Sequence, residues 1–112
     1  AFEEIVLGKD AKMKASAIVQ GSTGAVRSTV AGDPQAIGYA SLASVDQTVK
    51  SVRVNGIAPS AATILDGTYK ISRPFLYLTK TAPSGDVKQF IDFILSTEGQ
   101  ALIEEEGLVK VK

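Results

Sequence analysis

The clearest periodic pattern in the chain is an apolar stripe near its C-terminal end. Its members recur at the i, i+3, i+4, i+7 and i+8 spacing of one helical face: Val87, Phe90, Ile91, Ile94 and Leu95. Ser84 precedes them as an N-cap, so the pattern predicts a helix whose stripe packs into the core. Thr97 and Gln100 form a Thr-x-x-Gln capping box, which predicts a second helix running to Glu106 and stopping at Gly107.

Three shorter segments also carry helix signals, and each of them is closed by a glycine. Ser60 caps the third of them, and Ser44 begins a Ser-x-x-Gln capping box that predicts one further helical turn. The three predicted helices are Phe2 to Leu7 before Gly8, Ala25 to Ala31 before Gly32, and Ala61 to Asp66 before Gly67.

Four segments have the composition or the alternation typical of strands. In the segment Val49 to Val54, polar and apolar residues alternate from Ser51 onward, and Asn55-Gly56 after it favours a tight turn. Pro74 interrupts the longest segment, so it should lie at a strand edge or a break. Because these segments alternate with helices, the sequence predicts an α/β fold, with a short sheet flanked by helices. The predicted strands are Ala15 to Gln20, Ile37 to Ala40, Val49 to Val54 and Tyr69 to Lys80.

The composition excludes several classes of function, whereas it says less about the fold. The chain has 112 residues, 45% of them hydrophobic, which suits one domain that buries about two-thirds of its unfolded surface. It contains no Cys and no His, which removes disulfides, most zinc sites and His-dependent nucleophilic catalysis. Its 12 basic residues balance 12 acidic ones, which argues against a nucleic-acid partner. We therefore expect no enzymatic activity, no metal, no cofactor and no direct membrane span, whereas composition leaves the compartment open.

The segment with the most chemical content is Gly21-Ser22-Thr23-Gly24, between a predicted strand and a predicted helix. Such a junction directs backbone N–H groups and the positive end of the helix dipole toward one point. The hydroxyls of Ser22 and Thr23 add donors without charge, so Ser22, Thr23 and Gly24 are the candidate ligand-binding residues for phosphate or sulfate. The alternative is an ordinary N-cap, in which Ser22 or Thr23 satisfies the first helical amides. The spacing matches neither a Walker A loop nor a dinucleotide fingerprint.

Other polar and aromatic residues are weaker candidates. Arg73, before Pro74, is either an oxyanion clamp or the partner of a nearby carboxylate, and we favour the second interpretation. The run of glutamates from 104 to 106 cannot converge on one metal ion, since consecutive helical positions point about 100° apart. Glu3-Glu4 is interpreted as a solvated face. The three tyrosines are expected to be core residues with hydrated hydroxyls: Tyr39, Tyr69 and Tyr77.

Several stretches of the sequence carry a resemblance when they are taken together. Residues 33–39 read DPQAIGY, and residues 72–77 read SRPFLY. Residues 90–100 read FIDFILSTEGQ, and GLV follows at 107–109. In this order, these stretches resemble the phosphate ABC transporter substrate-binding proteins, whose pattern includes P-x-A-I-G-Y and a C-terminal F-I-D-F-x-L-S-x-E-G-Q. The resemblance covers nearly the whole chain.

The resemblance implies a type II periplasmic-binding-protein fold, a two-lobed Venus-flytrap, of which this chain is the C-terminal half. It implies that residues 1–36 close the distal lobe, residues 37–41 cross between the lobes, and residues 42–112 form the C-terminal part of the first lobe. The sequence starts just after the position of the family's S-G-T-R phosphate loop. The family's aspartate acceptor and early Thr/Ser donors also have no counterpart, so most of the ligand contacts are not carried over.

Two functions from different classes follow as hypotheses. The first is an extracytoplasmic phosphate-binding module, in the periplasm or attached to the cell surface, that binds inorganic phosphate between lobes and serves an ABC transporter permease. The second is a non-catalytic half-domain, structural or signalling, that pairs with the N-terminal half of the same fold or with itself. The second hypothesis rests on the open sheet edges and apolar faces expected at 49–54 and 69–80.

Overall fold

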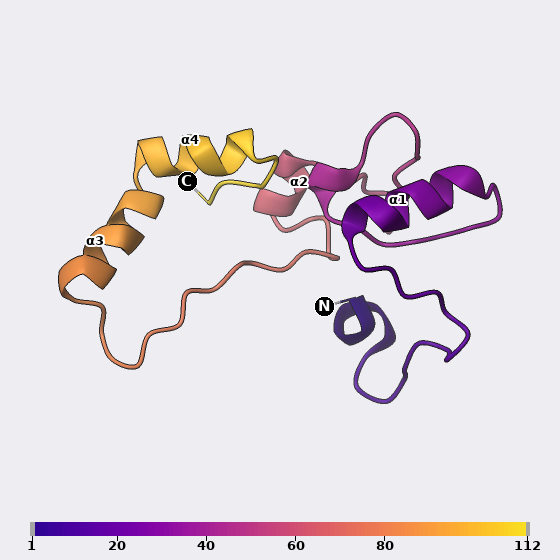
Figure 1. Ribbon diagram of the computed structural model, residues 1–112, viewed down its shortest axis with the longest axis horizontal. Coiled ribbons are helices and arrows are strands. Elements are labelled where there is room, and N and C mark those ends of the chain that lie inside the picture. The colour runs from indigo at the N-terminus through magenta and orange to yellow at the C-terminus, as the bar shows by residue number, and fades with distance from the viewer. Residues whose placement is uncertain (1, 112) are drawn as a thin grey trace.

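The computed structural model describes residues 2–111, and the regular elements within that range are helical (Figure 1). The helices predicted near both ends of the chain and in its middle are confirmed to within a few residues. Ala1, the first residue of the predicted distal-lobe segment, lies outside the described range, as does Lys112. None of the helices in this range is long and apolar enough to span a bilayer. In order, the elements are the π-helix η1 (Glu3–Leu7), α1 (Thr23–Gly32), the 3₁₀-helix η2 (Leu42–Ser44), α2 (Ala61–Leu65), α3 (Gly85–Ile94) and α4 (Thr97–Glu105).

Serine N-caps set where the helices begin, because the first amides of a helix have no partner inside it. Ser60 is the predicted cap of α2, and its Oγ accepts the backbone N–H of Thr63 at 3.2 Å. The Thr63 hydroxyl in turn accepts the backbone N–H of Ser60 at 3.0 Å, which completes a capping box. Ser84 is the N-cap residue of α3, as predicted, although its side chain makes no capping hydrogen bond.

Two predicted capping boxes are wrong. The N-cap of α4 is Ser96 rather than Thr97, and the Ser96 Oγ accepts the backbone N–H of Gly99 at 3.2 Å. Ser44 ends η2 instead of opening a helical turn, because its hydroxyl is bonded to side chains outside the segment that follows. A hydroxyl near a helix start has several possible partners, and local spacing alone does not select among them.

The predicted sheet is the main error. Within residues 2–111 the four predicted strands form no ladder, and only an isolated antiparallel bridge joins Val54 to Ile57. An α/β fold with a short sheet flanked by helices is therefore wrong for this chain. The physical reason is that strand composition reflects the fit to a pleated, half-buried surface beside another strand. No second strand lies alongside any of these segments in the described range, so their β-branched and aromatic residues have no neighbouring strand to pack against.

The turn at Asn55-Gly56 is confirmed even without a sheet. Both residues have positive φ angles, 53° and 81°, which is the geometry that a type I′ turn requires. Val54 and Ile57 exchange two backbone hydrogen bonds across the turn, at 2.9 and 3.0 Å. This tight turn is a local property of the two-residue sequence and needs no neighbouring strand.

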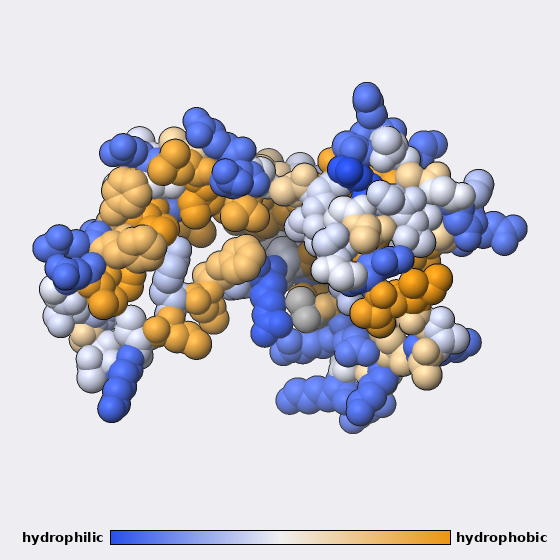
Figure 2. Space-filling model, in the orientation of Figure 1, coloured by the Kyte–Doolittle hydropathy of each residue, from blue (hydrophilic) through white to orange (hydrophobic). Residues whose placement is uncertain are grey.

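The described residues contain no buried hydrophobic side chain. The accessible surface is 9039 Å², where a folded monomer of this mass has about 5,900 Å². The radius of gyration is 16.8 Å, against about 13 Å for a compact chain of this length. Apolar side chains accordingly lie open on the surface, coloured orange in Figure 2. The predicted two-thirds burial is therefore wrong, and so is the core packing of the α3 stripe, where Val87 and Phe90 are 52% and 58% exposed.

The best-packed part of the molecule is the elbow between α3 and α4 (Figure 1). Gly99 has no room for a side chain, because a Cβ there would lie 2.2 Å from the carbonyl oxygen of Phe93. Gln100, only 5% exposed, donates from Nε2 to the carbonyl of Ile94 at 2.8 Å. Its Oε1 accepts the backbone N–H of Val111, also at 2.8 Å. One side chain thus joins the end of α3, the start of α4 and the C-terminal residues.

A second packed region brings the predicted crossover, residues 37–41, against α1. Gly38 approaches the helix so closely that a Cβ would lie 2.8 Å from Cγ1 of Val26. Tyr39 stacks on Phe2, with ring centroids 4.4 Å apart and planes inclined by 2°. Tyr39 and Tyr77 are 54% and 51% exposed, so the prediction that they are core residues is wrong. Residues 37–41 are nevertheless held against α1, whose start carries the candidate ligand-binding residues.

Candidate functional site

The predicted ligand-binding residues lie at the start of α1. Ser22 is the N-cap, and its Oγ accepts the backbone N–H of Ala25 at 3.1 Å. Its carbonyl oxygen accepts the N–H of Val26, also at 3.1 Å. Within residues 2–111 no hydrogen bond uses the backbone N–H of Thr23 or of Gly24. Ser22 therefore serves as the ordinary N-cap of the alternative interpretation, while Thr23 and Gly24 leave two helical amides open to solvent.

Three hydroxyls meet beside these amides, and we refer to Thr23, Ser41 and Ser44 as the hydroxyl cluster. The Ser44 Oγ donates to Oγ1 of Thr23 at 2.6 Å and lies 2.8 Å from the Oγ of Ser41. A hydroxyl carries one proton, so Ser41 is the donor to Ser44. The bonds run in one direction, from Ser41 through Ser44 to Thr23. The hydroxyl proton of Thr23 is the last donor in this series of hydrogen bonds, and the two preceding bonds polarise the Thr23 hydroxyl as a donor.

An ion pair lies one helical turn further along α1. The Arg27 guanidinium is 3.0 Å from Oδ2 of Asp46 and also donates to the carbonyl of Ser44 at 3.4 Å. Hydrogen bonds from the side chain and the backbone N–H of Thr48 lower the pKa of Asp46, and the charge of Arg27 lowers it further. Asp46 is therefore ionised at neutral pH and offsets Arg27. The donors left at the start of α1 are neutral amides and a hydroxyl.

The other candidate residues have partners away from this site. Arg73 forms an ion pair with Glu4, at 3.2 Å, which agrees with the favoured carboxylate interpretation. Glu104 pairs with Lys110 at 3.1 Å. In the part of the chain that the structure describes, no three or more acidic side chains gather as metal ligands. These residues therefore explain local structure and do not extend the candidate site.

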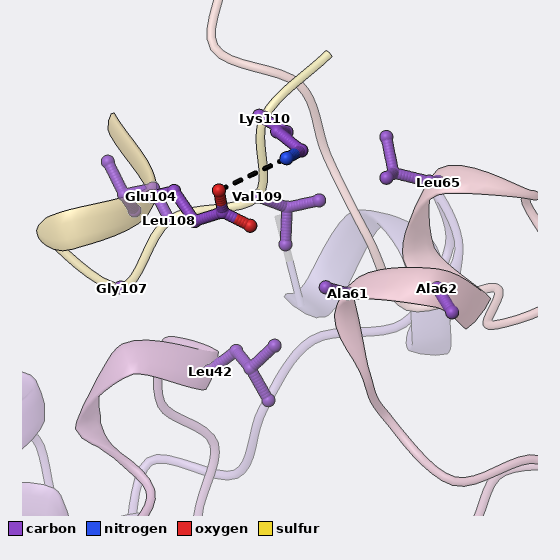
Figure 3. Close-up of a pocket in the computed structure, with 9 residues that line it drawn as sticks. All are labelled: Leu42, Ala61, Ala62, Leu65, Glu104, Gly107, Leu108, Val109 and Lys110. Atoms are coloured by element: carbon purple, nitrogen blue, oxygen red, sulfur yellow. Dashed lines mark hydrogen bonds and ion pairs between the residues drawn. The ribbon is translucent and has the colours of Figure 1, made fainter. Parts of the chain in front are cut away.

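A pocket of about 430 Å³ lies elsewhere, between η2, α2, α4 and the C-terminal residues (Figure 3). Its polar members are Glu104 and Lys110, which bind each other across one side of the opening. A carboxylate repels an anion, and the lysine charge is already paired, so this pocket does not suit phosphate. It is a gap between poorly packed elements. Its lining is otherwise mainly apolar: Leu42, Ala61, Ala62, Leu65, Gly107, Leu108 and Val109.

The structure adds residues that sequence reasoning missed. Ser41, Ser44 and Arg27 lie next to the predicted residues Thr23 and Gly24, although Ser44 is 21 positions from Thr23 in the sequence. Arg27 belongs to a predicted helix, Ser41 ends the predicted crossover, and Ser44 was interpreted as a cap, so none of them was marked as a binding residue. Serines are common in loops for many reasons, so their presence alone could not have identified the cluster.

A helix start with free amides is a recurring way to hold a small anion. A family model described as a PBP superfamily domain matches residues 1–98. This match covers most of the chain, so the chain belongs to the PBP superfamily.

Particular relatives narrow the comparison. The chain is 43% identical over 95 residues to Phosphate-binding protein PstS 2 of Streptococcus agalactiae, covering 84% of this chain and 32% of the relative. It is 37% identical over 119 residues to Phosphate-binding protein PstS 2 of Streptococcus pneumoniae, covering all of this chain and 41% of the relative. It is 28% identical over 104 residues to Phosphate-binding protein PstS of Bacillus subtilis, covering 91% of this chain and 35% of the relative. No solved structure gives a significant match.

These relatives confirm the resemblance to phosphate-binding substrate-binding proteins. The chain spans about a third to two-fifths of the length of the curated relatives it matches. Their names describe binding proteins, which is consistent with the expectation that the chain is not an enzyme.

Proposed function

We propose that this chain contributes to an extracytoplasmic phosphate-binding protein that serves ABC-type phosphate import. The names of the matched relatives support this role, since they are phosphate-binding proteins. In this proposal residues 1–36 belong to a distal lobe, residues 37–41 cross between lobes, and residues 42–112 belong to the first lobe. Inorganic phosphate lies between the lobes, and an ABC permease receives it. The chain itself has no catalytic role.

The observation that carries the proposal is the set of neutral donors at the start of α1. The free N–H groups of Thr23 and Gly24 and the hydroxyl of Thr23 are adjacent, and the hydroxyl cluster polarises that hydroxyl. A helix N-terminus adds the positive end of its dipole. In our proposal these donors contact phosphate oxygens. The Ser22 hydroxyl does not contact phosphate; it keeps its N-cap hydrogen bond and stabilises the start of the helix.

The proposal also implies that this chain alone holds phosphate poorly. Phosphate offers four oxygens, and the site supplies three donors from one side, two of them open to solvent. Hydrogen bonds to a solvated anion yield little net free energy unless the anion is enclosed. Titration calorimetry of the 112-residue chain with inorganic phosphate should show no binding in the micromolar range. Micromolar or tighter binding would contradict the half-site account.

A chimera tests the site itself. The segment of the Streptococcus pneumoniae relative that aligns with this chain is replaced by residues 1–112, since the alignment covers the whole of this chain. The chimera should bind phosphate. Thr23→Val should weaken binding by about 10- to 100-fold, the usual cost of one hydrogen bond to a charged group.

Ser28→Ala is the matched control, because Ser28 is an exposed hydroxyl of the same helix without a hydrogen bond in the described structure. It should leave phosphate affinity unchanged. A folded chimera that does not bind phosphate would refute the proposed function. A chimera that binds phosphate equally well with Thr23→Val would refute only the proposed site.

A further inference from the structure

The tight turn at Asn55-Gly56 carries reactive groups that phosphate binding does not use. Asn55 is the only asparagine of the chain. Among the described residues it is also the only non-glycine residue with a positive φ, 53°, and both turn residues are exposed. In the described structure no hydrogen bond uses the Asn55 side chain or the backbone N–H of Gly56. A side-chain amide and the backbone nitrogen of the next residue are therefore both free to react.

We propose that Asn55 is a site of spontaneous deamidation, through a succinimide formed with Gly56. The backbone nitrogen of Gly56 attacks Cγ of Asn55, and the new N–Cγ bond forms as the Cγ–Nδ2 bond breaks. The displaced amide nitrogen takes the Gly56 proton and leaves as ammonia. Water then opens the imide ring at Cγ, which gives aspartate, or at the backbone carbonyl carbon of Asn55, which gives isoaspartate. One water is consumed and one ammonia is released, and nothing is oxidised or reduced.

Gly56 makes the attack sterically easy. Glycine has no side chain beside the attacking nitrogen. The surroundings are open as well, since even a Cβ at this position would meet no atom within 4 Å. Both residues are exposed, so the water needed to open the ring is present. Asparagine is a thermolabile residue, and here no part of the described chain covers it.

The closed turn slows the reaction without preventing it. Ring closure needs a negative ψ angle at Asn55, whereas a left-handed residue has ψ of about +47°, so the turn must open first. Two backbone hydrogen bonds between Val54 and Ile57, at 2.9 and 3.0 Å, hold it closed. Each bond reduces the open population by about 2- to 12-fold, and the two together by about 5- to 150-fold. Within residues 2–111 no strand lies beside this isolated bridge to hold it more firmly.

The chain contains a second pair that forms the same imide, Asp66-Gly67, and the structure protects it. The backbone N–H of Gly67 donates to the carbonyl of Ile64 at 3.2 Å. The Asp66 carboxylate accepts the hydroxyl and the backbone N–H of Thr68, at 2.6 and 2.8 Å, and these bonds lower the pKa of Asp66. A carboxylate that stays ionised resists attack. The two reacting groups are therefore engaged here, whereas those of the turn are free.

Intact mass spectrometry of the 112-residue chain measures the reaction, because asparagine occurs only once. During incubation at mildly basic pH the chain should gain about 1 Da, and its formal net charge should fall from zero to minus one. The folded chain should react about 5- to 150-fold more slowly than the same chain in urea. Asn55→Asp is the control and should gain no mass. A folded chain that gains no mass, one that reacts as fast as in urea, or an equal gain in Asn55→Asp would overturn the proposal.

A pair of proline variants tests whether opening of the turn sets the rate. Val54→Pro removes the N–H that donates to the carbonyl of Ile57, so it should speed deamidation by about 2- to 12-fold. Val52→Pro is the matched control, since Val52 is 61% exposed and makes no backbone hydrogen bond in the described structure. It should leave the rate unchanged. Equal rates in the two variants would refute the gating by the turn.

Peptide mapping identifies the products and the protected pair. A protease that cleaves before aspartate should cut the aspartate product at position 55 and leave the isoaspartate product intact. In the same incubation Asp66 should form isoaspartate far more slowly than Asn55, because its reacting groups are engaged. Equal rates at the two sites would show that the structure does not select between them and would overturn the proposal. None of these outcomes depends on phosphate binding.

Discussion

The strongest quantitative prediction concerns Gln100, which joins three segments at the elbow between α3 and α4. Gln100→Ala removes the hydrogen bonds to the carbonyl of Ile94 and from the N–H of Val111, both 2.8 Å long. A hydrogen bond of this kind contributes about 0.5 to 1.5 kcal/mol, so the two together contribute about 1 to 3 kcal/mol. Because Gln100 is only 5% exposed, water cannot easily replace either partner.

The suitable measurement is amide hydrogen exchange, since it reports the local opening of one element. The amides of α4 should exchange about 5- to 150-fold faster in Gln100→Ala, which is the same free energy expressed as a protection factor. Amides of α1 should exchange at the wild-type rate, because α1 shares no contact with Gln100.

Gln89→Ala is the matched control, since Gln89 is an exposed glutamine of α3 that makes no side-chain hydrogen bond in the described structure. It should change the exchange of α4 by less than about twofold. Gln100→Glu keeps the acceptor for Val111 but sets a carboxylate oxygen against the carbonyl oxygen of Ile94 at a position only 5% exposed, so it should speed exchange at least as much as Gln100→Ala. If the amides of α4 exchange at the same rate in Gln100→Ala and Gln89→Ala, the bridging role of Gln100 is refuted.

Three further predictions follow from local geometry. Gly99→Ala should separate α3 from α4, because its Cβ would lie 2.2 Å from a carbonyl oxygen; unchanged chemical shifts in both helices would contradict this. Ser60→Ala should cost α2 about 1 kcal/mol, seen as faster amide exchange in α2 with α1 unaffected; equal protection would exclude the capping box. The carboxyl of Asp46 should titrate below its usual value of 3.8, so its stabilisation is present above that pH and is lost as the pH falls through the lowered pKa. Thr48→Val should raise the pKa of Asp46 in a carboxyl-carbon NMR titration, and an unchanged value would refute the assigned cause.

The helices could be predicted because their signals are local. An N-cap, an apolar stripe and a terminal glycine all act within a few residues, and the helix itself satisfies most of its backbone groups. For this reason α2 begins after Ser60, and the turn at Asn55-Gly56 adopts positive φ without a sheet. Helix starts shifted where several hydroxyls compete, as at Ser96 and Thr97.

The strands could not be predicted in the same way. A strand completes its backbone hydrogen bonds only with a partner, and no segment of the described chain lies beside residues 75–78. The same limit applies to the stripe on α3, whose helical spacing was correct and whose burial was not, because burial requires a surface to pack against. Periodicity predicts which face of an element is apolar, and it does not predict what covers that face.

In the candidate site, too, the local features could be predicted from the sequence and the long-range contacts could not. The sequence by itself determined that Ser22 precedes a helix, that Gly21 and Gly24 flank Ser22 and Thr23, and that no His or Cys is available for other chemistry. Only the tertiary structure decided that Ser41 and Ser44 reach Thr23 and that Asp46 neutralises Arg27. The first set depends on contacts within about four residues along one helix. The second depends on the chain folding back across some 20 positions, and that return is decided by packing, which local residue patterns do not encode.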